Sequence, residues 1–170
     1  MKTKRHNPKR YGELYNSQHI DNQIEELENI KEFIVLSGGW AWHFLSPPHN
    51  EYKHLHDHSD IDIFVKPENF TKVQLTLTEN EWFRMKTKYD NNNFIRYEKI
   101  RDGRKMVIDM FKGEIPNINS NGWNVTEPNY LLSLYKTVHQ SDNCIAVTKS
   151  RELIKNEKPI INSEELIKLK

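Results

Sequence analysis

Two aspartates inside an alternating apolar segment are the residues of this sequence best suited to chemistry. Residues 58–65 read His-Ser-Asp-Ile-Asp-Ile-Phe-Val, a pattern typical of a β-strand, where successive side chains point to opposite faces. Asp60 and Asp62 then share one face, roughly 6.5–7 Å apart, while the alternate apolar side chains enter a core. Neighbouring carboxylates repel each other and are costly to bury unpaired. A divalent cation such as Mg²⁺ explains them, because it takes carboxylate and phosphate oxygens as ligands.

Two other apolar segments carry residues that complement this pair. Residues 33–42 read Phe-Ile-Val-Leu-Ser-Gly-Gly-Trp-Ala-Trp, a strand that runs through Ser37, Gly38 and Gly39 into a helical segment. Glycine lets the backbone approach a ligand closely, and the N–H groups that open a helix bind phosphate. A later apolar strand, Met-Val-Ile-Asp-Met-Phe, carries one carboxylate, Asp109. If the two acidic strands are neighbours, three carboxylates form a metal site beside a phosphate cradle.

These motifs resemble the signature of the polymerase-β-like nucleotidyltransferase superfamily. There, a Gly-Gly turn opens a helix, an Asp-x-Asp pair lies within a strand, and a third aspartate comes from a later strand. The Gly-Gly-Trp-Ala turn and the His-Ser-Asp-Ile-Asp strand look most similar to the small branch that adenylylates aminoglycoside and lincosamide antibiotics. The resemblance covers roughly residues 30–112, and only the three motifs together are specific.

The resemblance implies transfer of a nucleoside monophosphate from a nucleoside triphosphate (NTP) to an acceptor hydroxyl, with release of pyrophosphate. Asp60, Asp62 and Asp109 would be the catalytic and metal-binding residues, with Mg²⁺ or Mn²⁺ as the cation and ATP as the expected donor. Asp109 would ligate a second ion or accept the acceptor's proton. The acceptor, whether a small molecule, RNA or a protein, is not identified by the sequence.

The resemblance also implies contacts to the nucleotide. The Ser-Gly-Gly turn would hold the β- and γ-phosphates. His58 would border the metal site, and Lys136 would reach the triphosphate, although Lys149 and Arg151 compete for that role.

Composition limits the alternatives. The chain has 170 residues, one domain of ordinary size, with 36% hydrophobic residues and a net charge of +1. That charge does not indicate a nucleic-acid partner, although it leaves one open. Its only cysteine, Cys144, cannot form an internal disulfide, and no apolar run is long enough to cross a membrane. We therefore expect a cytoplasmic protein, and the sequence does not predict its oligomeric state.

The expected fold is α+β, a mixed β-sheet flanked by helices with a helical C-terminal part. A basic segment over residues 1–19 precedes a nucleotidyltransferase core over residues 20–115, and residues 116–170 pack on this core. The local patterns predict a helix over 20–33 with Asp21 as N-cap, a helix over 68–80, strands over 82–88 and 94–100, a loop over 113–126, and helices from 127 onward. Asp102-Gly103 predicts a hairpin between the second of these strands and the Asp109 strand.

Other interpretations stay open at this stage. Asp60 and Asp62 would also suit a polar strand face in contact with water. A catalytically degenerate nucleotidyltransferase would bind a nucleotide or a partner without transfer, and a sugar transferase would also use an Asp-x-Asp motif with a metal. His54, His56 and His58 alternate in a polar segment and would suit Zn²⁺, but no second ligand cluster accompanies them.

Overall fold

The computed structural model describes residues 17–45, 58, 60–88 and 93–139, without the side chains of residues 132 and 135–139. Several expectations lie outside these residues: the basic N-terminal segment, the roles of His54 and His56, the competition of Lys149 and Arg151 with Lys136, and the last helix. Within them, no helix is both long and apolar enough to cross a membrane.

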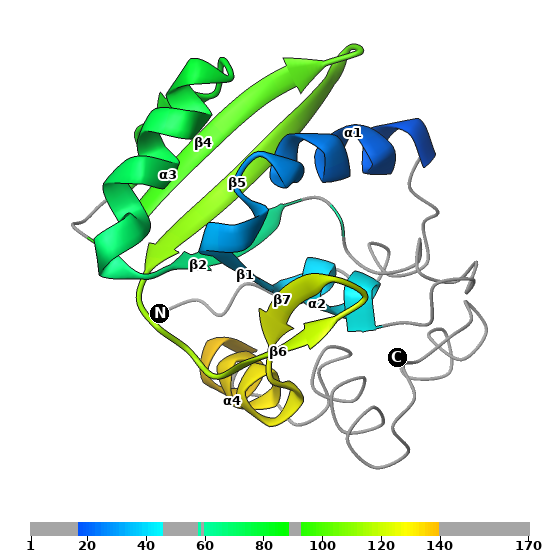
Figure 1. The fold of residues 1–170 in the computed structure, drawn as a ribbon, viewed down its shortest axis with the longest axis vertical. Coiled ribbons are helices and arrows are strands. Elements are labelled where there is room, and N and C mark those ends of the chain that lie inside the picture. Colours follow the sequence, from blue (N-terminus) through cyan, green and yellow to red (C-terminus); the bar gives the residue numbers. More distant parts are fainter. Residues whose placement is uncertain (1–16, 46–57, 59, 89–92, 140–170) are drawn as a thin grey trace.

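Five helical segments and seven strands make up the described chain (Figure 1). The helical segments are α1 (Ser17–Glu28), the short 3-10 helix η2 (Lys31–Phe33), α2 (Gly38–Leu45), α3 (Pro67–Glu79) and α4 (Pro128–His139). The strands are β1 (Ile34–Ser37), β2 (Ile61–Val65), β3 (Phe83–Met85), β4 (Phe94–Arg101), β5 (Arg104–Lys112), β6 (Asn117–Ser120) and β7 (Trp123–Thr126).

All seven strands form one mixed sheet in the order β3-β4-β5-β2-β1-β7-β6. The β2–β5 and β1–β7 pairs are parallel, and the other pairs are antiparallel. The α+β prediction with a mixed sheet is therefore confirmed. The strand β2 carries the second aspartate of the Asp-x-Asp (DxD) motif. It lies in the middle of the sheet, where strands on both sides fix its position.

Several local predictions differ from the structure. The helix expected over 20–33 ends at Glu28 and is followed by η2, and the strand expected over 82–88 spans only Phe83–Met85. Two others were wrong in kind. The stretch expected as a loop over 113–126 contains the β6–β7 hairpin, which extends the sheet beyond β1. Asn121 and Gly122 both have positive φ angles, 53° and 84°, as a two-residue hairpin turn requires. Asp21 does not cap a helix, because α1 already begins at Ser17 and includes Asp21.

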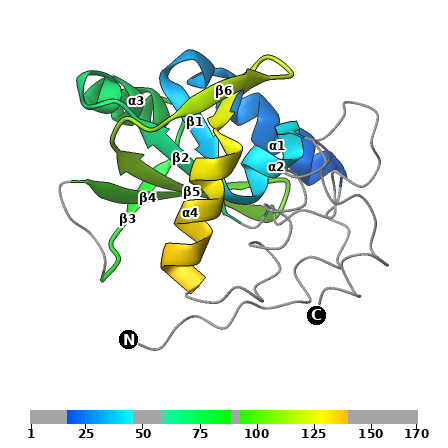
Figure 2. The ribbon, with the colours of Figure 1, turned by 90° about the horizontal axis from the view of Figure 1, so that it is seen from below.

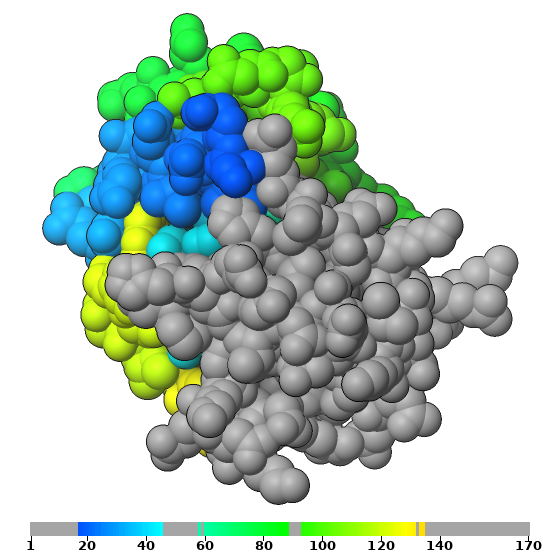
Figure 3. Space-filling view, turned by 90° about the vertical axis from the view of Figure 1, so that its right-hand side faces the viewer, coloured from blue at the N-terminus to red at the C-terminus, as the bar shows by residue number. Residues whose placement is uncertain are grey.

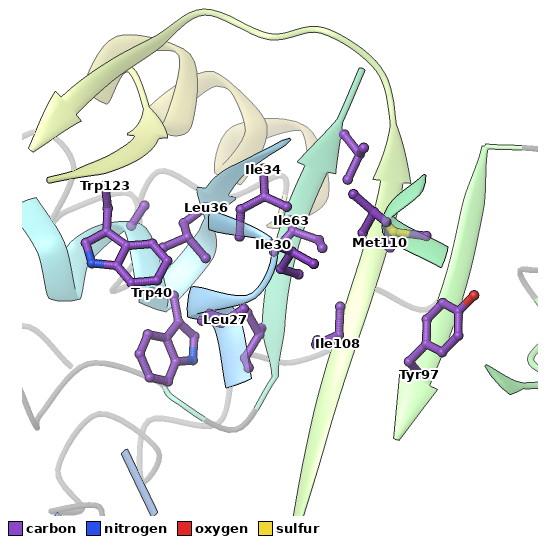
Figure 4. Packing of buried hydrophobic residues seen from close by; sticks show 14 of the residues in the cluster. Leu27, Ile30, Ile34, Leu36, Trp40, Ile63, Tyr97, Ile108, Met110 and Trp123 are labelled. Carbon is purple, nitrogen blue, oxygen red and sulfur yellow. The ribbon is translucent and has the colours of Figure 1, made fainter. Parts of the chain in front are cut away.

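Helices α1 and α3 lie on the same face of the sheet (Figures 1 and 2). Pro67 opens α3, where its fixed φ suits the first turn of a helix. Alternate strand residues point into the core beneath the helices, and Ile63 and Ile108 are fully buried there. Figure 4 shows Ile63 beside Ile30, with Leu27 of α1 and with Ile108 and Met110 of β5 around them. The opposite face of β2 and β5 carries the aspartates.

A buried carboxylate joins α1 to the β4–β5 hairpin, which lies beside this helix on the surface (Figure 3). Glu26, only 8% exposed, accepts hydrogen bonds from Trp82 Nε1 at 3.1 Å and from Arg101 at 3.3 Å, and it pairs with Lys99 at 2.9 Å. Three donors satisfy this carboxylate, so its burial does not leave an unpaired charge. The ion pairs hold the long hairpin against the helical layer.

Candidate active site

The two DxD aspartates lie at the beginning of β2. Ile61, Ile63 and Val65 are all 0% exposed, whereas Asp60 and Asp62 are half-buried on the other face. The alternation predicted from the sequence is thus confirmed. Because β2 begins at Ile61, Asp60 stands just before the strand and Asp62 stands within it.

The third aspartate lies directly beside this pair. β5 runs parallel to β2, and their register places Asp109 opposite Asp62. Paired residues on adjacent strands point to the same face, with backbones roughly 4.8 Å apart. Asp109 is 8% exposed, so its carboxylate sits in a largely dry environment. The two acidic strands are therefore neighbours, which is the condition on which the sequence-based three-carboxylate group depended.

Arg96 of β4 holds this third carboxylate, a contact that the sequence reasoning missed. Its Nε donates to Asp109 Oδ1 at 2.7 Å and its Nη2 donates to Oδ2 at 2.9 Å, a bidentate pair. The hydrogen bond to Asp109 raises the pKa of Arg96 above its ordinary value, and the charges of Asp109 and Asp60 act in the same direction, against desolvation. The guanidinium therefore lies within the field of two of the three aspartates.

The glycine turn lies against the same group. β1 is antiparallel to β2 and places Ser37, which is 4% exposed, opposite Asp62. Gly38 has a φ of +59°, and a Cβ added there would lie only 2.5 Å from Asp62 Oδ2. Only glycine fits this position without strain. Gly39 follows at the start of α2 and is half-buried, so the turn and the DxD carboxylate form one continuous surface.

His58 lies behind the surface formed by the glycine turn and the Asp62 carboxylate. Its side chain is 0% exposed, and its Nε2 lies 2.8 Å from Nδ1 of His43, a buried residue of α2. Trp40 presents an edge-to-face contact to the His58 ring at 4.8 Å between centroids, and Gln23 donates to the His58 carbonyl at 3.2 Å. These contacts link the glycine-turn helix to the segment that precedes Asp60. His43 was not singled out from the sequence, because a histidine among aromatic residues gives no motif.

Helix α4 contains Lys136, whose side chain is outside the described residues. The beginning of this helix is fixed by Glu127, whose carboxylate accepts hydrogen bonds from the backbone N–H groups of Asn129 at 3.0 Å and Tyr130 at 2.9 Å. Burial acts to raise the pKa of Glu127, but these hydrogen bonds outweigh it and lower the pKa below its ordinary value. The carboxylate therefore serves as the N-terminal cap.

The donor set fits a hard divalent cation in its chemistry, since Asp60, Asp62 and Asp109 offer carboxylate oxygens on one face. Among the described residues, however, no three His, Cys, Asp or Glu side chains are already arranged to hold a metal ion. Both oxygens of Asp109 accept hydrogen bonds from Arg96 instead. A cation bound to Asp109 would therefore share these oxygens with the Arg96 guanidinium.

Comparisons with known proteins place the fold. No protein-family profile matches the sequence, and no curated protein sequence matches it. The crystal structure of ANT(2'')-Ia in complex with adenylyl-2''-tobramycin is similar, with a TM-score of 0.55 and 10% identity, over 90% of this chain and 95% of that one. The Megavirus polyadenylate synthase has a TM-score of 0.42 and 13% identity; the match includes 99% of this chain but spans only 34% of the synthase. The chain has the nucleotidyltransferase fold that its motifs predicted.

Proposed function

We propose that this protein is a metal-dependent nucleotidyltransferase that moves a nucleoside monophosphate from an NTP, with ATP as the expected donor, to an acceptor hydroxyl. The observation that carries the proposal is the convergence of separate motifs on one face. Asp62 is the register neighbour of Asp109 on one side and of Ser37 on the other, and its carboxylate lies against Gly38. A structural role alone gives no reason to place these groups together.

Asp60 and Asp62 would hold Mg²⁺ or Mn²⁺ through their carboxylate oxygens, and Asp109 would complete the group. When bound, such a cation would neutralise charge on the triphosphate and on the transferred phosphoryl group. The backbone N–H groups of Gly38 and Gly39 would bind the β- and γ-phosphates at the start of α2. The α-phosphate would then lie beside the aspartates.

In the transfer step, the acceptor oxygen forms a bond to the α-phosphorus. The bond from the α-phosphorus to the bridging oxygen of the β-phosphate breaks, and that oxygen leaves with the electron pair as pyrophosphate. Asp109, which lies one strand away from the DxD strand, would take the acceptor's proton. The protein mainly supplies positioning and charge neutralisation, as in other phosphoryl transfers.

A second candidate is a nucleotide-binding module without transfer activity. The Arg96–Asp109 pair favours it, because both oxygens of the expected proton acceptor are engaged. Such a module would retain binding through the glycine turn and the DxD pair. The two candidates therefore differ in transfer and not in binding.

The test is incubation of the purified protein with each of four α-labelled NTPs, Mg²⁺ and a panel of acceptors. The panel contains cell extract, RNA and tobramycin; tobramycin is included because the similar crystal structure holds its adenylylated form. Label in an acceptor, identified by mass, together with pyrophosphate release supports transfer. The control is the Asp60→Asn, Asp62→Asn double variant, which should incorporate no label.

NTP binding without label in any acceptor would favour the binding module. Absence of both NTP binding and label transfer would refute both candidates.

A further inference from the structure

Arg96 is the one cationic side chain that the described structure places directly on the third carboxylate, and the transfer mechanism above gives it no part. Its side chain is 32% exposed and that of Asp109 is 11% exposed, so the pair sits at the boundary between the site and solvent. Planar bidentate pairs of this kind are among the stronger ionic contacts in proteins. The same guanidinium fork also binds phosphate bidentately.

The register shows that Arg96 belongs to the site. β4 pairs with β5 so that Arg96 lies opposite Asp109, and Asp109 lies opposite Asp62 on β2. Arg96, Asp109 and Asp62 therefore form one row across three strands on the same face. Their neighbours Ile95 and Tyr97 point into the core on the other face, 4% and 3% exposed.

A divalent cation at this row would face a positive charge already in place. A cation that binds carboxylate oxygens at roughly 2.0–2.1 Å would lie within about 5 Å of a guanidinium that donates to the same carboxylate. Two positive charges at that distance repel, and Arg96 has already neutralised one of the three carboxylates. A bound triphosphate would offset this repulsion between the cation and Arg96, because the phosphate oxygens would offer the guanidinium a new partner.

We propose that Arg96 is a phosphate-binding residue of this site that pairs with Asp109 in the absence of nucleotide and moves to the triphosphate when metal and NTP bind. This inference rests on the proposed function. Arg96 suppresses binding of the free cation and releases Asp109 for the reaction only when an NTP is present. Metal binding and nucleotide binding are thus coupled through one side chain.

The experiment compares Mn²⁺ binding by the full chain with and without the α,β-methylene analogue of ATP, followed by the paramagnetic resonance of free Mn²⁺. Arg96→Gln should bind Mn²⁺ alone about tenfold more tightly than the wild type, because a charge-assisted pair no longer has to be broken. The gain in Mn²⁺ affinity produced by the analogue should be smaller in Arg96→Gln than in the wild type.

Arg84→Gln is the matched control. Arg84 lies on the adjacent strand β3, opposite Tyr97 and so on the other face, and it is exposed. The Arg84→Gln variant loses the same charge far from the carboxylates, so its Mn²⁺ affinity should equal that of the wild type. Arg96→Lys retains the charge without the fork and should fall between wild type and Arg96→Gln, which keeps the test available if Arg96→Gln does not fold.

An Mn²⁺ affinity of folded Arg96→Gln that equals or falls below that of the wild type would overturn the inference while leaving the proposed function intact. Equal affinities of Arg96→Lys and wild type would do the same. If the wild type binds no Mn²⁺ even with the nucleotide analogue, the proposed metal-dependent function itself fails, and the inference fails with it.

Discussion

Replacement of Gly38 by alanine separates the cost of backbone strain from the geometry of the site. Gly38 has a φ of +59°, and an added Cβ would lie 2.5 Å from Asp62 Oδ2. Gly103, in the β4–β5 turn, has a φ of +72°, and nothing lies within 4 Å of an added Cβ. The two glycines therefore share the strained conformation but differ in what surrounds them.

The expected loss of stability is similar in both variants. A left-handed conformation costs a non-glycine residue roughly 1–2 kcal/mol. For a chain of this size, such a cost lowers Tm by about 2–8 °C. The clash at Gly38 adds little to this cost, because the carboxylate can move away. Real Cβ contacts stay above 3.0 Å, so this carboxylate must move by at least about 0.5 Å.

The functional effects should differ. In enzymes generally, a misplacement of roughly 1 Å can cost about 100-fold in rate. We expect Gly38→Ala to bind Mn²⁺ and ATP at least about tenfold more weakly than Gly103→Ala, because its Asp62 no longer occupies the same place. Thermal melts measure the strain, and calorimetric titration with Mn²⁺ and ATP measures the binding.

Two results would refute this reasoning. If Gly38→Ala binds Mn²⁺ and ATP as tightly as Gly103→Ala, the contact between the turn and Asp62 is structural only. If both variants lose binding equally, the loss follows stability and not the geometry of the site.

The other predictions concern carboxylates. Asp60→Asn with Asp62→Asn should abolish metal-dependent NTP binding while the protein stays folded, and calorimetry that shows unchanged affinity would contradict the metal site. Asp109→Asn should lower kcat and kcat/KM together by about 10²–10⁴-fold with a far smaller loss of NTP affinity, whereas normal turnover would make Asp109 a structural carboxylate. Glu127 has a lowered pKa in the folded state, so its contribution to stability is complete above the unfolded pKa of about 4.5 and is lost as pH falls through the folded value. The difference in unfolding free energy between wild type and Glu127→Gln in urea melts should therefore be present at pH 7 and shrink as pH falls below 4.5; a gap that persists in acid would argue against the cap.

Prediction of the site from the sequence was most accurate where a local pattern determines which face of a strand a side chain occupies. The alternation around Asp60 and Asp62 settled which side chains enter the core, and the two-residue turn at Asp102-Gly103 determined that β4 and β5 form a hairpin. Asp102 and Gly103 have φ angles of 51° and 72°, as that turn requires. The adjacency of Asp109 and Asp62 was conditional on strand order, which no local pattern specifies.

The features that the sequence analysis missed depend on strand register and on contacts between residues that are distant in the sequence. Arg96 could have been found, because counting back from the Asp102-Gly103 turn places it opposite Asp109. The β6–β7 hairpin also had a signal, Asn121-Gly122, but the polar strands around it resembled a loop. The His43–His58 contact had none, since it joins residues from α2 and from the segment before β2.

The central parallel pair also has a consequence for how the protein folds. The β4–β5 hairpin can form early, in roughly 1–10 μs, because its strands are joined by a two-residue turn. β2 and β5 must instead meet across the intervening α3, β3 and β4, and such non-local pairing is slow. We therefore expect Asp109 and Arg96 to pair within the hairpin before Asp62 joins them. The row of Asp62, Asp109 and Arg96 is complete only where β5 pairs with β2, so the candidate site depends on this non-local contact.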